Sequence, residues 1–503
     1  MAEQESRSHN NRTAAISTLF GHTAEELAHA RPGANSVATL KRKGPPNRMN
    51  DLSYRDWMKF QKSFFRFTGW QQFVDDSVSF FTKELWPDGA VSKSLVLGFP
   101  PPTQQLMGSR SIELNATSDL EAITADLRQR CGGQQKFDFI LLNLTPKAVS
   151  NNPSYLCDQH TSILRSLRAL LFKSRYCCVI TQWDANSFPD PWALAASSRQ
   201  FLKLRDETIG LNGPFQPSYY CLFLQAEDDC SNPEDWHPDQ TQIAASEPGR
   251  FPTWVMPKSP PRKADEINHP AKFPEKLVTD FIEAFTVPGE TILDPMMGTG
   301  STLVAALGSA RNAVGIDLNP RFVAVAGERI SAKTLSLLEK PTNAKIMEGD
   351  ARDVVRLLGK EKIDYCVTSP PYWSMLSNEG SENQKARRDR HLPTVYSESK
   401  TDLGNIEDYE SFLGTLISIY DGVGKLLKRG GYLTVVVKNI KRNHTIYPLG
   451  WDLVRRLAAN GSKFEFAGTT LWCQDDVGLK PFAVGIYWVS NTLHTYCLHF
   501  RRR

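Results

Sequence analysis

The chain has 503 residues, 41% of them hydrophobic and 23% charged, a globular composition long enough for two or three domains of common size. Its nine cysteines include no CxxC pair, which argues against a disulfide scaffold and favours a reducing compartment. The sequence contains no apolar run of membrane-spanning length, and residues 1–20 lack the apolar core of a signal peptide. We therefore expect a soluble, intracellular protein with no membrane partner. The net charge of +4 permits nucleic-acid binding only through a local surface.

Four segments are predicted in chain order. Residues 1–49 are polar and end in KRKGPPNR, so we expect a disordered basic arm. Residues 50–227 alternate short apolar strands with helical patterns, as in a parallel α/β sheet, and begin with a predicted aromatic helix over 51–67. Residues 228–263 are rich in Asp, Pro, Ser and Lys and are predicted to be a linker. A second α/β series occupies residues 264–503.

The two α/β segments resemble each other in sequence. FDFILLNLTP aligns with IDYCVTSPPY, ILRSLRALLFKSRYCCVIT with IYDGVGKLLKRGGYLTVVV, and SYYCLFLQ with HTYCLHF. We interpret this likeness as an internal duplication, with chance similarity between two Rossmann-like sheets as the alternative.

The segment ETILDPMMGTGSTLVAALGSARNAVGIDLNP is a predicted nucleotide-binding βαβ unit. Gly298 and Gly300 allow a tight turn and the close approach of a ligand to the backbone, and the following helix presents free N–H groups. Asp317 follows the second strand, where a carboxylate can accept hydrogen bonds from ribose hydroxyls. The third glycine of the dinucleotide fingerprint is missing, so a dinucleotide site is disfavoured.

Two motifs in this region resemble a known family. DPMMGTGST is similar to the DPF-x-GSGTT signature of amino-methylating DNA methyltransferases, and HPAKFPEKLVTDFI is similar to the family's HPAxFPxxL segment. The resemblance implies a Rossmann-like class I methyltransferase sheet, seven-stranded and mostly parallel, preceded by a second, degenerate Rossmann-like domain. It also implies S-adenosylmethionine as cofactor and DNA as partner.

The resemblance further implies a set of cofactor-binding residues. They are Lys272, Phe273, Pro274, Asp294, Pro295, Met296, Gly298, Gly300, Ser301, Thr302, Asp317, Asp350 and Ala351. Among them Asp317 would hold the ribose and Asp350 the adenine amine. Met296 and Met297 replace Phe-like positions of the consensus with soft apolar side chains. No metal site is predicted.

The strip DYCVTSPPYW offers a catalytic site at the carboxyl end of a predicted strand. The Ser369 hydroxyl and the Pro370 carbonyl can accept hydrogen bonds from the exocyclic amine of a base, and Pro370 and Pro371 fix their directions. Tyr372 offers a ring on which an extruded base can stack. A proline-rich turn with buried aromatic side chains is the competing interpretation of the strip alone.

Serine at the first position of the strip resembles the subgroup that makes N4-methylcytosine, so we expect an enzyme that methylates cytosine N4 in DNA. N6-adenine methylation of DNA and amino-methylation of an RNA base are alternatives, as is a catalytically silent nucleic-acid-binding subunit. Methylation at cytosine C5 is disfavoured because that chemistry uses a nucleophilic cysteine, in that family within a Pro-Cys pair, and the chain has none.

The catalytic strip follows the cofactor motif, whereas the commonest order in these enzymes is the reverse. Asn143, Leu144, Thr145 and Pro146 occupy the slot of the strip in the first α/β segment, so we expect that segment to be catalytically silent and either structural or in contact with DNA.

Between residues 374 and 407 a polar loop carries Lys385, Arg387, Arg388 and Arg390, which are candidate phosphate contacts, with a solvated charge run as the alternative. The compartment would be cytoplasm or nucleoid in a prokaryote and the nucleus in a eukaryote; the sequence leaves the oligomeric state open.

Overall fold

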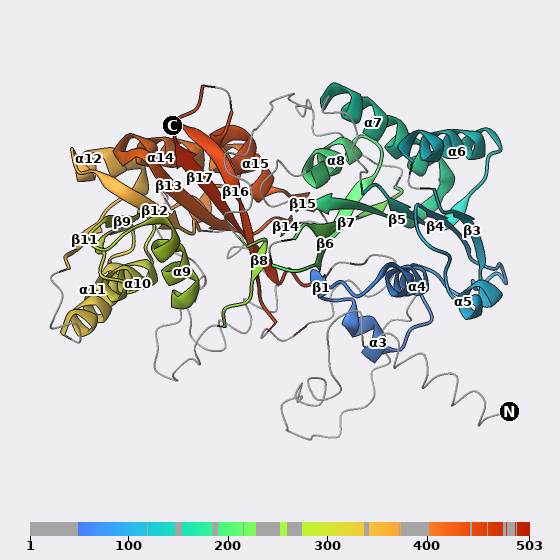
Figure 1. Cartoon of the computed structure of the whole chain (residues 1–503), viewed down its shortest axis with the longest axis horizontal. Helices are drawn as coiled ribbons and strands as arrows, with labels where there is room; N and C mark the ends of the chain where they lie inside the picture. The colour runs from blue at the N-terminus through green and yellow to red at the C-terminus, as the bar shows by residue number, and fades with distance from the viewer. Residues whose placement is uncertain are drawn as a thin grey trace, which may run out of the picture.

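A computed structural model describes residues 49–503, except for 118, 146–152, 184–189, 215, 228–251, 259–273, 336–341, 372, 374–401, 443–444, 460, 476–478, 480–487 and 489. The described chain forms two α/β halves that lie side by side (Figure 1), a first half at residues 49–227 and a second half at residues 252–503. Among the described residues, none of the helices is both long and apolar enough to cross a bilayer.

The first half is built on a seven-stranded sheet. Its strands are β1 (Phe64–Arg66), β2 (Lys93–Leu97), β3 (Ser111–Asn115), β4 (Phe137–Asn143), β5 (Leu171–Trp183), β6 (Lys203–Leu211) and β7 (Ser218–Gln225). Their order across the sheet is β1-β6-β7-β5-β4-β2-β3, and β7 is antiparallel to both of its neighbours. One face carries α3 (Tyr54–Lys59), α4 (Trp70–Phe81) and α5 (Gln104–Ser109), and the other carries α6 (Leu120–Gly132), α7 (Pro153–Leu170) and α8 (Asp190–Ser198) (Figure 1).

The second half is built on an eight-stranded sheet. Its strands are β8 (Trp254–Val255), β9 (Thr291–Asp294), β10 (Asn312–Asp317), β11 (Ala344–Glu348), β12 (Ile363–Thr368), β13 (Leu427–Val437), β16 (Phe464–Cys473) and β17 (His494–Arg502). Their order is β11-β10-β9-β12-β13-β17-β16-β8, with β17 antiparallel to its neighbours. A separate two-stranded hairpin consists of β14 (Ile440–Arg442) and β15 (Thr445–Tyr447).

Helices cover both faces of the second sheet as well. One face carries α9 (Glu275–Phe285), α10 (Ser301–Gly308) and α11 (Pro320–Leu335), and the other carries α12 (Val354–Leu358), α14 (Tyr409–Leu426) and α15 (Leu449–Leu457) (Figure 1). Two short 3₁₀ turns, η1 (Ala351–Asp353) and η2 (Leu403–Asn405), lie in connections. This arrangement confirms the predicted Rossmann-like sheet of seven mostly parallel strands, with β8 added at its edge.

The two sheets match in strand order and in register. Strands β4, β5, β6 and β7 of the first sheet correspond to β12, β13, β16 and β17 of the second. The pairing of β4 with β5 has a register shift between Phe137 and Phe139, and the pairing of β12 with β13 has one between Ile363 and Tyr365. A second register shift lies between Leu204 and Asp206 in the pairing of β6 with β7, and between Phe466 and Gly468 in the pairing of β16 with β17. At the outer edges β1 and β8 take the same parallel place. The first sheet lacks only a counterpart of β11.

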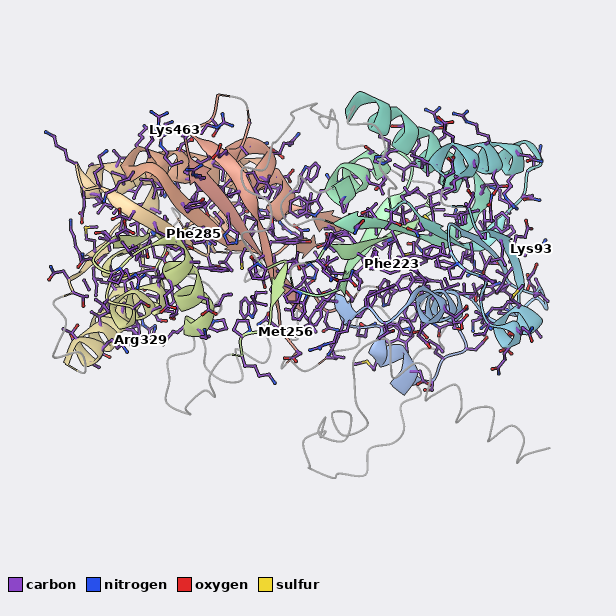
Figure 2. All side chains as sticks on the ribbon, in the orientation of Figure 1. Lys93, Phe223, Met256, Phe285, Arg329 and Lys463 are labelled. Atoms are coloured by element: carbon purple, nitrogen blue, oxygen red, sulfur yellow. The ribbon has the colours of Figure 1, made fainter. Side chains whose placement is uncertain are left out.

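Three hydrophobic clusters fill the layers between sheets and helices. One cluster is continuous through both halves and includes Leu142 and Leu164 from the first half and Leu293 and Leu416 from the second. Each opposite face has its own cluster, with Phe223 in the first half and Phe285 packed against the cluster of the second half (Figure 2). The halves therefore share one hydrophobic core layer, and apolar packing joins them in addition to polar contacts.

Two local predictions differ from the structure. Only Tyr54–Lys59 of the predicted helix over 51–67 is helical, because Phe64 enters strand β1 beside β6. The aromatic side chains of Trp57, Phe60 and Phe64 are buried. The predicted linker 228–263 contains β8, whose backbone pairs with β16. Such a two-residue strand is too short to produce an alternating sequence pattern.

Candidate active site

Strands β9, β10, β11 and β12 run parallel, so their carboxyl ends meet at one edge of the second sheet. This edge receives Asp294 from β9, Asp317 from β10, Asp350 just after β11 and Ser369 just after β12. Residues separated by up to 75 positions in the sequence are thereby brought to one place. The fold thus places the predicted cofactor turn and the predicted catalytic strip at neighbouring strand ends.

Asp294 is the link between the turn and the strip. Its carboxylate accepts hydrogen bonds from the hydroxyl of Thr302 on α10 at 2.6 Å, from the hydroxyl of Thr368 at the end of β12 at 2.7 Å, and from the backbone N–H of Met296 at 3.1 Å. The residue is only 1% exposed, and this burial raises the pKa of Asp294 to about 6, against the opposing effect of the hydroxyl donors.

The glycine turn has the conformation that its sequence predicts. Gly298 and Gly300 have φ of 53° and 76°, in the left-handed region that glycine adopts without strain, and α10 begins immediately after Gly300. A Cβ atom on Gly300 would lie 3.0 Å from Cβ of Ala326 on α11. The turn is therefore closely packed on its α11 side and presents the N-terminal amides of α10 at the sheet edge.

Asp317 closes the turn from the neighbouring strand. Its carboxylate accepts hydrogen bonds from the backbone N–H groups of Gly298 at 2.8 Å and Asn319 at 2.9 Å. Burial raises its pKa to about 6, and the negative charge of Asp402 acts in the same direction. Each carboxylate oxygen keeps a second lone pair, so the group can still accept hydrogen bonds from the hydroxyls of a ligand.

Asp350 lies at the end of the next strand but already has a local partner. It caps η1 by accepting the backbone N–H of Arg352 at 2.9 Å and forms an ion pair with the Arg352 guanidinium. Although burial alone would raise its pKa, these bonds lower the pKa of Asp350, so the carboxylate is ionised and able to accept a hydrogen bond. The neighbouring Ala351 is buried.

The catalytic strip leaves the sheet directly after Thr368. Ser369 and Pro371 are partly buried and Pro370 is buried. Trp373, only 3% exposed, packs against the rings of Tyr409 and Tyr447 at centroid distances of 5.3 and 4.8 Å. Tyr372 lies outside the described residues, as do Lys272, Phe273 and the whole run 374–401 that contains Lys385, Arg387, Arg388 and Arg390.

The other predicted residues occupy the turn or its flank. Pro274 precedes α9 and is buried, Pro295 and Met296 lead into the turn, and Ser301 and Thr302 begin α10. Lys438 and Asn439 follow β13; Asn439 is buried and Lys438 partly buried, and desolvation lowers the pKa of Lys438 to about 8. Asn439 does not contribute to this edge; its side chain bonds to Glu207 of the first half.

Two residues of the site were not singled out from the sequence. Thr368 joins the strip to Asp294, and its only sequence signal was a hydroxyl residue immediately before the Ser-Pro-Pro strip. Arg329 on α11 reaches the turn, where its guanidinium donates to the Thr299 carbonyl and hydroxyl and to the Ser301 hydroxyl. An arginine on an exposed helical pattern gives no such signal, because its partner is set by the packing of α11 against α10.

Among its described residues, the first sheet has no equivalent of this arrangement. In the shared register Val96 takes the place of Asp294 and Leu142 the place of Thr368, and both are completely buried. Ala116, just after β3, takes the place of Asp317, the last residue of β10. Asn143 stands in the place of Ser369; its side chain donates to the carbonyl of Gly98 just after β2 and accepts the backbone N–H of Thr145. Of the two edges, only that of the second sheet has acidic and hydroxyl groups at these positions.

Comparisons with known proteins agree with this placement. Residues 225–328 match a family described as DNA methylase (N6_N4_Mtase), and this range includes the turn and Asp317. The type II methyltransferase M.BglI of Bacillus subtilis is 35% identical over 92 residues, 18% of this chain and 25% of that protein. The tRNA (guanine(10)-N2)-dimethyltransferase of Methanothermobacter thermautotrophicus is 35% identical over 101 residues, 20% of this chain and 27% of that protein.

These matches therefore cover about a quarter of the length of either relative. Among solved structures, TrmN from Thermus thermophilus is 12% identical with a TM-score of 0.30, covering 76% of this chain and 78% of that one, a likeness too weak to support an inference. The resemblance that the motifs predicted is confirmed, together with S-adenosylmethionine as the cofactor of that family. The similarity to DNA amino-methyltransferases thus lies in residues 225–328, the region that contains the glycine turn and Asp317.

Proposed function

We propose that this chain transfers a methyl group from S-adenosylmethionine to the exocyclic N4 amine of cytosine in DNA. One observation carries the proposal: the Thr368 hydroxyl, immediately before Ser369, is hydrogen-bonded at 2.7 Å to Asp294, immediately before the glycine turn. A single buried carboxylate thereby holds the acceptor strip beside the cofactor turn.

The residues at the edge of the second sheet fit S-adenosylmethionine. Gly298 and Gly300 allow the left-handed turn that leads into the N-terminal amides of α10, Asp317 has free acceptor sites for ribose hydroxyls, and Asp350 has one for an adenine amine. Lys272, Phe273 and Pro274 would flank the methionine end, by resemblance to the family. When bound, the cofactor supplies an electrophilic methyl group on a sulfonium.

Ser369 and Pro370 would prepare the base for attack. The amine of cytosine is a poor nucleophile because its lone pair is delocalised into the ring. The Ser369 hydroxyl and the Pro370 carbonyl would accept hydrogen bonds from that amine and localise the lone pair, while Tyr372 would stack on the flipped ring. The amine nitrogen would bond to the methyl carbon as the carbon–sulfur bond breaks, which leaves S-adenosylhomocysteine, and the methylated amine would release one proton to solvent. No covalent bond to the protein is required.

Cytosine N4 is preferred over adenine N6 because the strip begins with serine, as in the N4-methylcytosine subgroup. The adenine enzyme remains the nearest alternative within the same chemistry. Amino-methylation of RNA is a second candidate, supported by the similarity of this chain to a tRNA dimethyltransferase. A silent binding subunit is disfavoured because the acidic and hydroxyl groups missing from the first sheet are all present in the second.

The remaining assignments follow from this function. We propose that residues 50–227 form a silent copy of the catalytic domain at 264–503, and that Lys385, Arg387, Arg388 and Arg390 contact DNA phosphates.

The proposal is tested by expressing the full chain in methylation-free cells and sequencing their DNA with a method that separates the three methylated bases. We expect N4-methylcytosine at a defined sequence, absent when Ser369→Ala and Tyr372→Ala are combined. Unmodified DNA together with methylated RNA would show that the substrate is RNA and not DNA. Methylated adenine without methylated cytosine would overturn the choice of base.

A further inference from the structure

The β14–β15 hairpin of the second half lies against the first half. Asn439, directly before β14, donates its amide to both carboxylate oxygens of Glu207 on β6, at 2.9 and 3.1 Å. Lys441 within β14 forms an ion pair with Asp206 at 2.6 Å. Arg199, just after α8, donates to the carbonyl of Ile446 within β15 at 3.2 Å. Three side chains of the first half therefore hold this hairpin.

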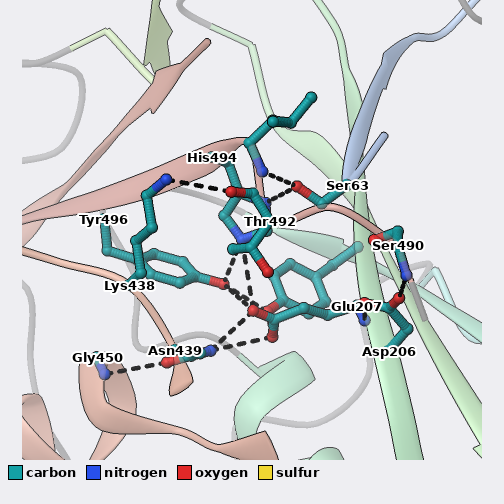
Figure 3. Close-up of polar contacts among 12 residues, drawn as sticks. Ser63, Asp206, Glu207, Lys438, Asn439, Gly450, Ser490, Thr492, His494 and Tyr496 are labelled. Atoms are coloured by element: carbon teal, nitrogen blue, oxygen red, sulfur yellow. Dashed lines mark hydrogen bonds and ion pairs between the residues drawn. The ribbon is translucent and has the colours of Figure 1, made fainter. Parts of the chain in front are cut away.

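Glu207 is the centre of a completely buried polar network between the halves (Figure 3). Besides Asn439 it accepts hydrogen bonds from the hydroxyls of Tyr220 and Tyr496, which lie 2.7 Å apart and occupy equivalent places on β7 and β17. Burial alone would raise the pKa of Glu207, but the hydrogen bonds and the charge of His494 lower it. The carboxylate is thus held in place by donors from both halves.

The Asn439 side chain also connects this network to the next helix. Its amide oxygen accepts the backbone N–H of Gly450 at 3.1 Å, near the start of α15. The position of the backbone between β13 and α15 is therefore fixed at one point by a residue of the first half.

The same hairpin contacts the catalytic strip. Tyr447 of β15 packs on the ring of Trp373, and the Arg442 guanidinium of β14 lies over that ring, 4.6 Å from its centroid. Tyr409 completes the aromatic cluster. Trp373 comes only two residues after Pro371. The hairpin thus joins the first half to the strip.

We propose that the first half positions the catalytic strip, with Glu207, Asp206 and Arg199 holding the β14–β15 hairpin and the hairpin holding Trp373. This inference deepens and rests on the proposed methyl transfer. These are positioning residues, because none of them lies at the cofactor edge. Small displacements of a strip that aligns an acceptor amine are expected to lower the rate strongly.

Other contacts between the halves bypass the hairpin and provide a control. The Tyr176 hydroxyl accepts the backbone N–H of Trp488 at 3.0 Å, and Ser63 accepts that of Leu493 at 2.8 Å. If the first half served only to stabilise the second, removing the Tyr176 or Ser63 contact would lower kcat as much as removing the contacts to the hairpin.

The test compares the full chain carrying Arg199→Met with Lys441→Met against Tyr176→Phe, and includes Lys441→Arg, which keeps the ion pair. We expect the double variant to lower kcat roughly tenfold or more with little change in KM for S-adenosylmethionine, and Lys441→Arg to retain activity. Tyr176→Phe should leave kcat unchanged. Hydrogen exchange of the peptide around 363–373 should accelerate only in the double variant.

The exchange measurement needs no substrate and therefore separates the two proposals. Accelerated exchange in a chain whose wild type methylates no DNA would leave positioning intact and refute the proposed function. Unchanged exchange and kcat in the double variant, or equal losses in Tyr176→Phe, would overturn positioning.

Discussion

The two sheets differ most at one pair of corresponding positions. In the second sheet a buried carboxylate, Asp294, is bonded to Thr368, whereas the first sheet has Val96 and Leu142 in those places. Both sheets nevertheless have the same strand order and the same register shifts. The fold therefore does not require the polar pair, and the energetic cost of burying a carboxylate is accepted only where the site needs it.

Replacing the polar pair with its apolar counterpart should produce the largest effect. Asp294→Val with Thr368→Leu removes the link between turn and strip, and we expect methyl transfer to fall roughly 10³-fold. The apolar pair already exists in the first sheet, so the variant should fold. Methylation by purified protein and circular dichroism check the two parts. Substantial activity in a folded variant would contradict the role of Asp294.

The same variant should change the pH dependence of stability. The pKa of Asp294 is raised from 3.8 to about 6 in the folded state, so the folded protein binds this proton more tightly than the unfolded chain. The resulting contribution to the free energy of unfolding is fully present below about pH 4 and is lost as pH rises through 6. The stability of the variant relative to wild type should therefore increase by up to about 3 kcal/mol between pH 4 and 7. Urea unfolding at each pH measures this difference, and a constant difference would contradict it.

Ser369 and Asn143 occupy the same register position and allow a matched comparison. Ser369→Ala removes an acceptor for the base amine, and we expect a loss of roughly 10²-fold in kcat. Asn143→Ala removes hydrogen bonds to Thr145 and to the Gly98 carbonyl, both within the first half, and should leave kcat unchanged. Equal losses in both variants would show that the first sheet also takes part in catalysis.

At Asp317 we expect a smaller effect, which is a pH-dependent change in the affinity for the cofactor. Protonation below its pKa of about 6 weakens the carboxylate as an acceptor of ribose hydroxyls, so affinity should fall roughly tenfold from pH 7 to pH 5. Calorimetry with S-adenosylhomocysteine measures the affinity. Asp317→Asn should bind weakly at both pH values, and an unchanged pH response in this variant would assign the effect to another group.

The sequence predicted the elements with strong local signals. The glycine turn, Asp317 and the strands of the second sheet were identified because each depends on neighbouring residues or on a short apolar run. Thr368 and Arg329 were missed because their roles depend on partners 74 and 30 positions away. The hairpin and its contacts to β6 were missed for the same reason. A short strand such as β8 exists only because β16 offers it a free edge.

The contacts near residue 62 have a consequence for synthesis. The backbone of Gln61 and Ser63 bonds to Asn491, about 430 residues later. At ordinary translation rates the first sheet is complete roughly 13 to 53 seconds before that partner is made. During this interval the surface that carries Asp206 and Glu207 faces solvent, and its two carboxylates would keep a waiting nascent chain soluble until the last strands arrive.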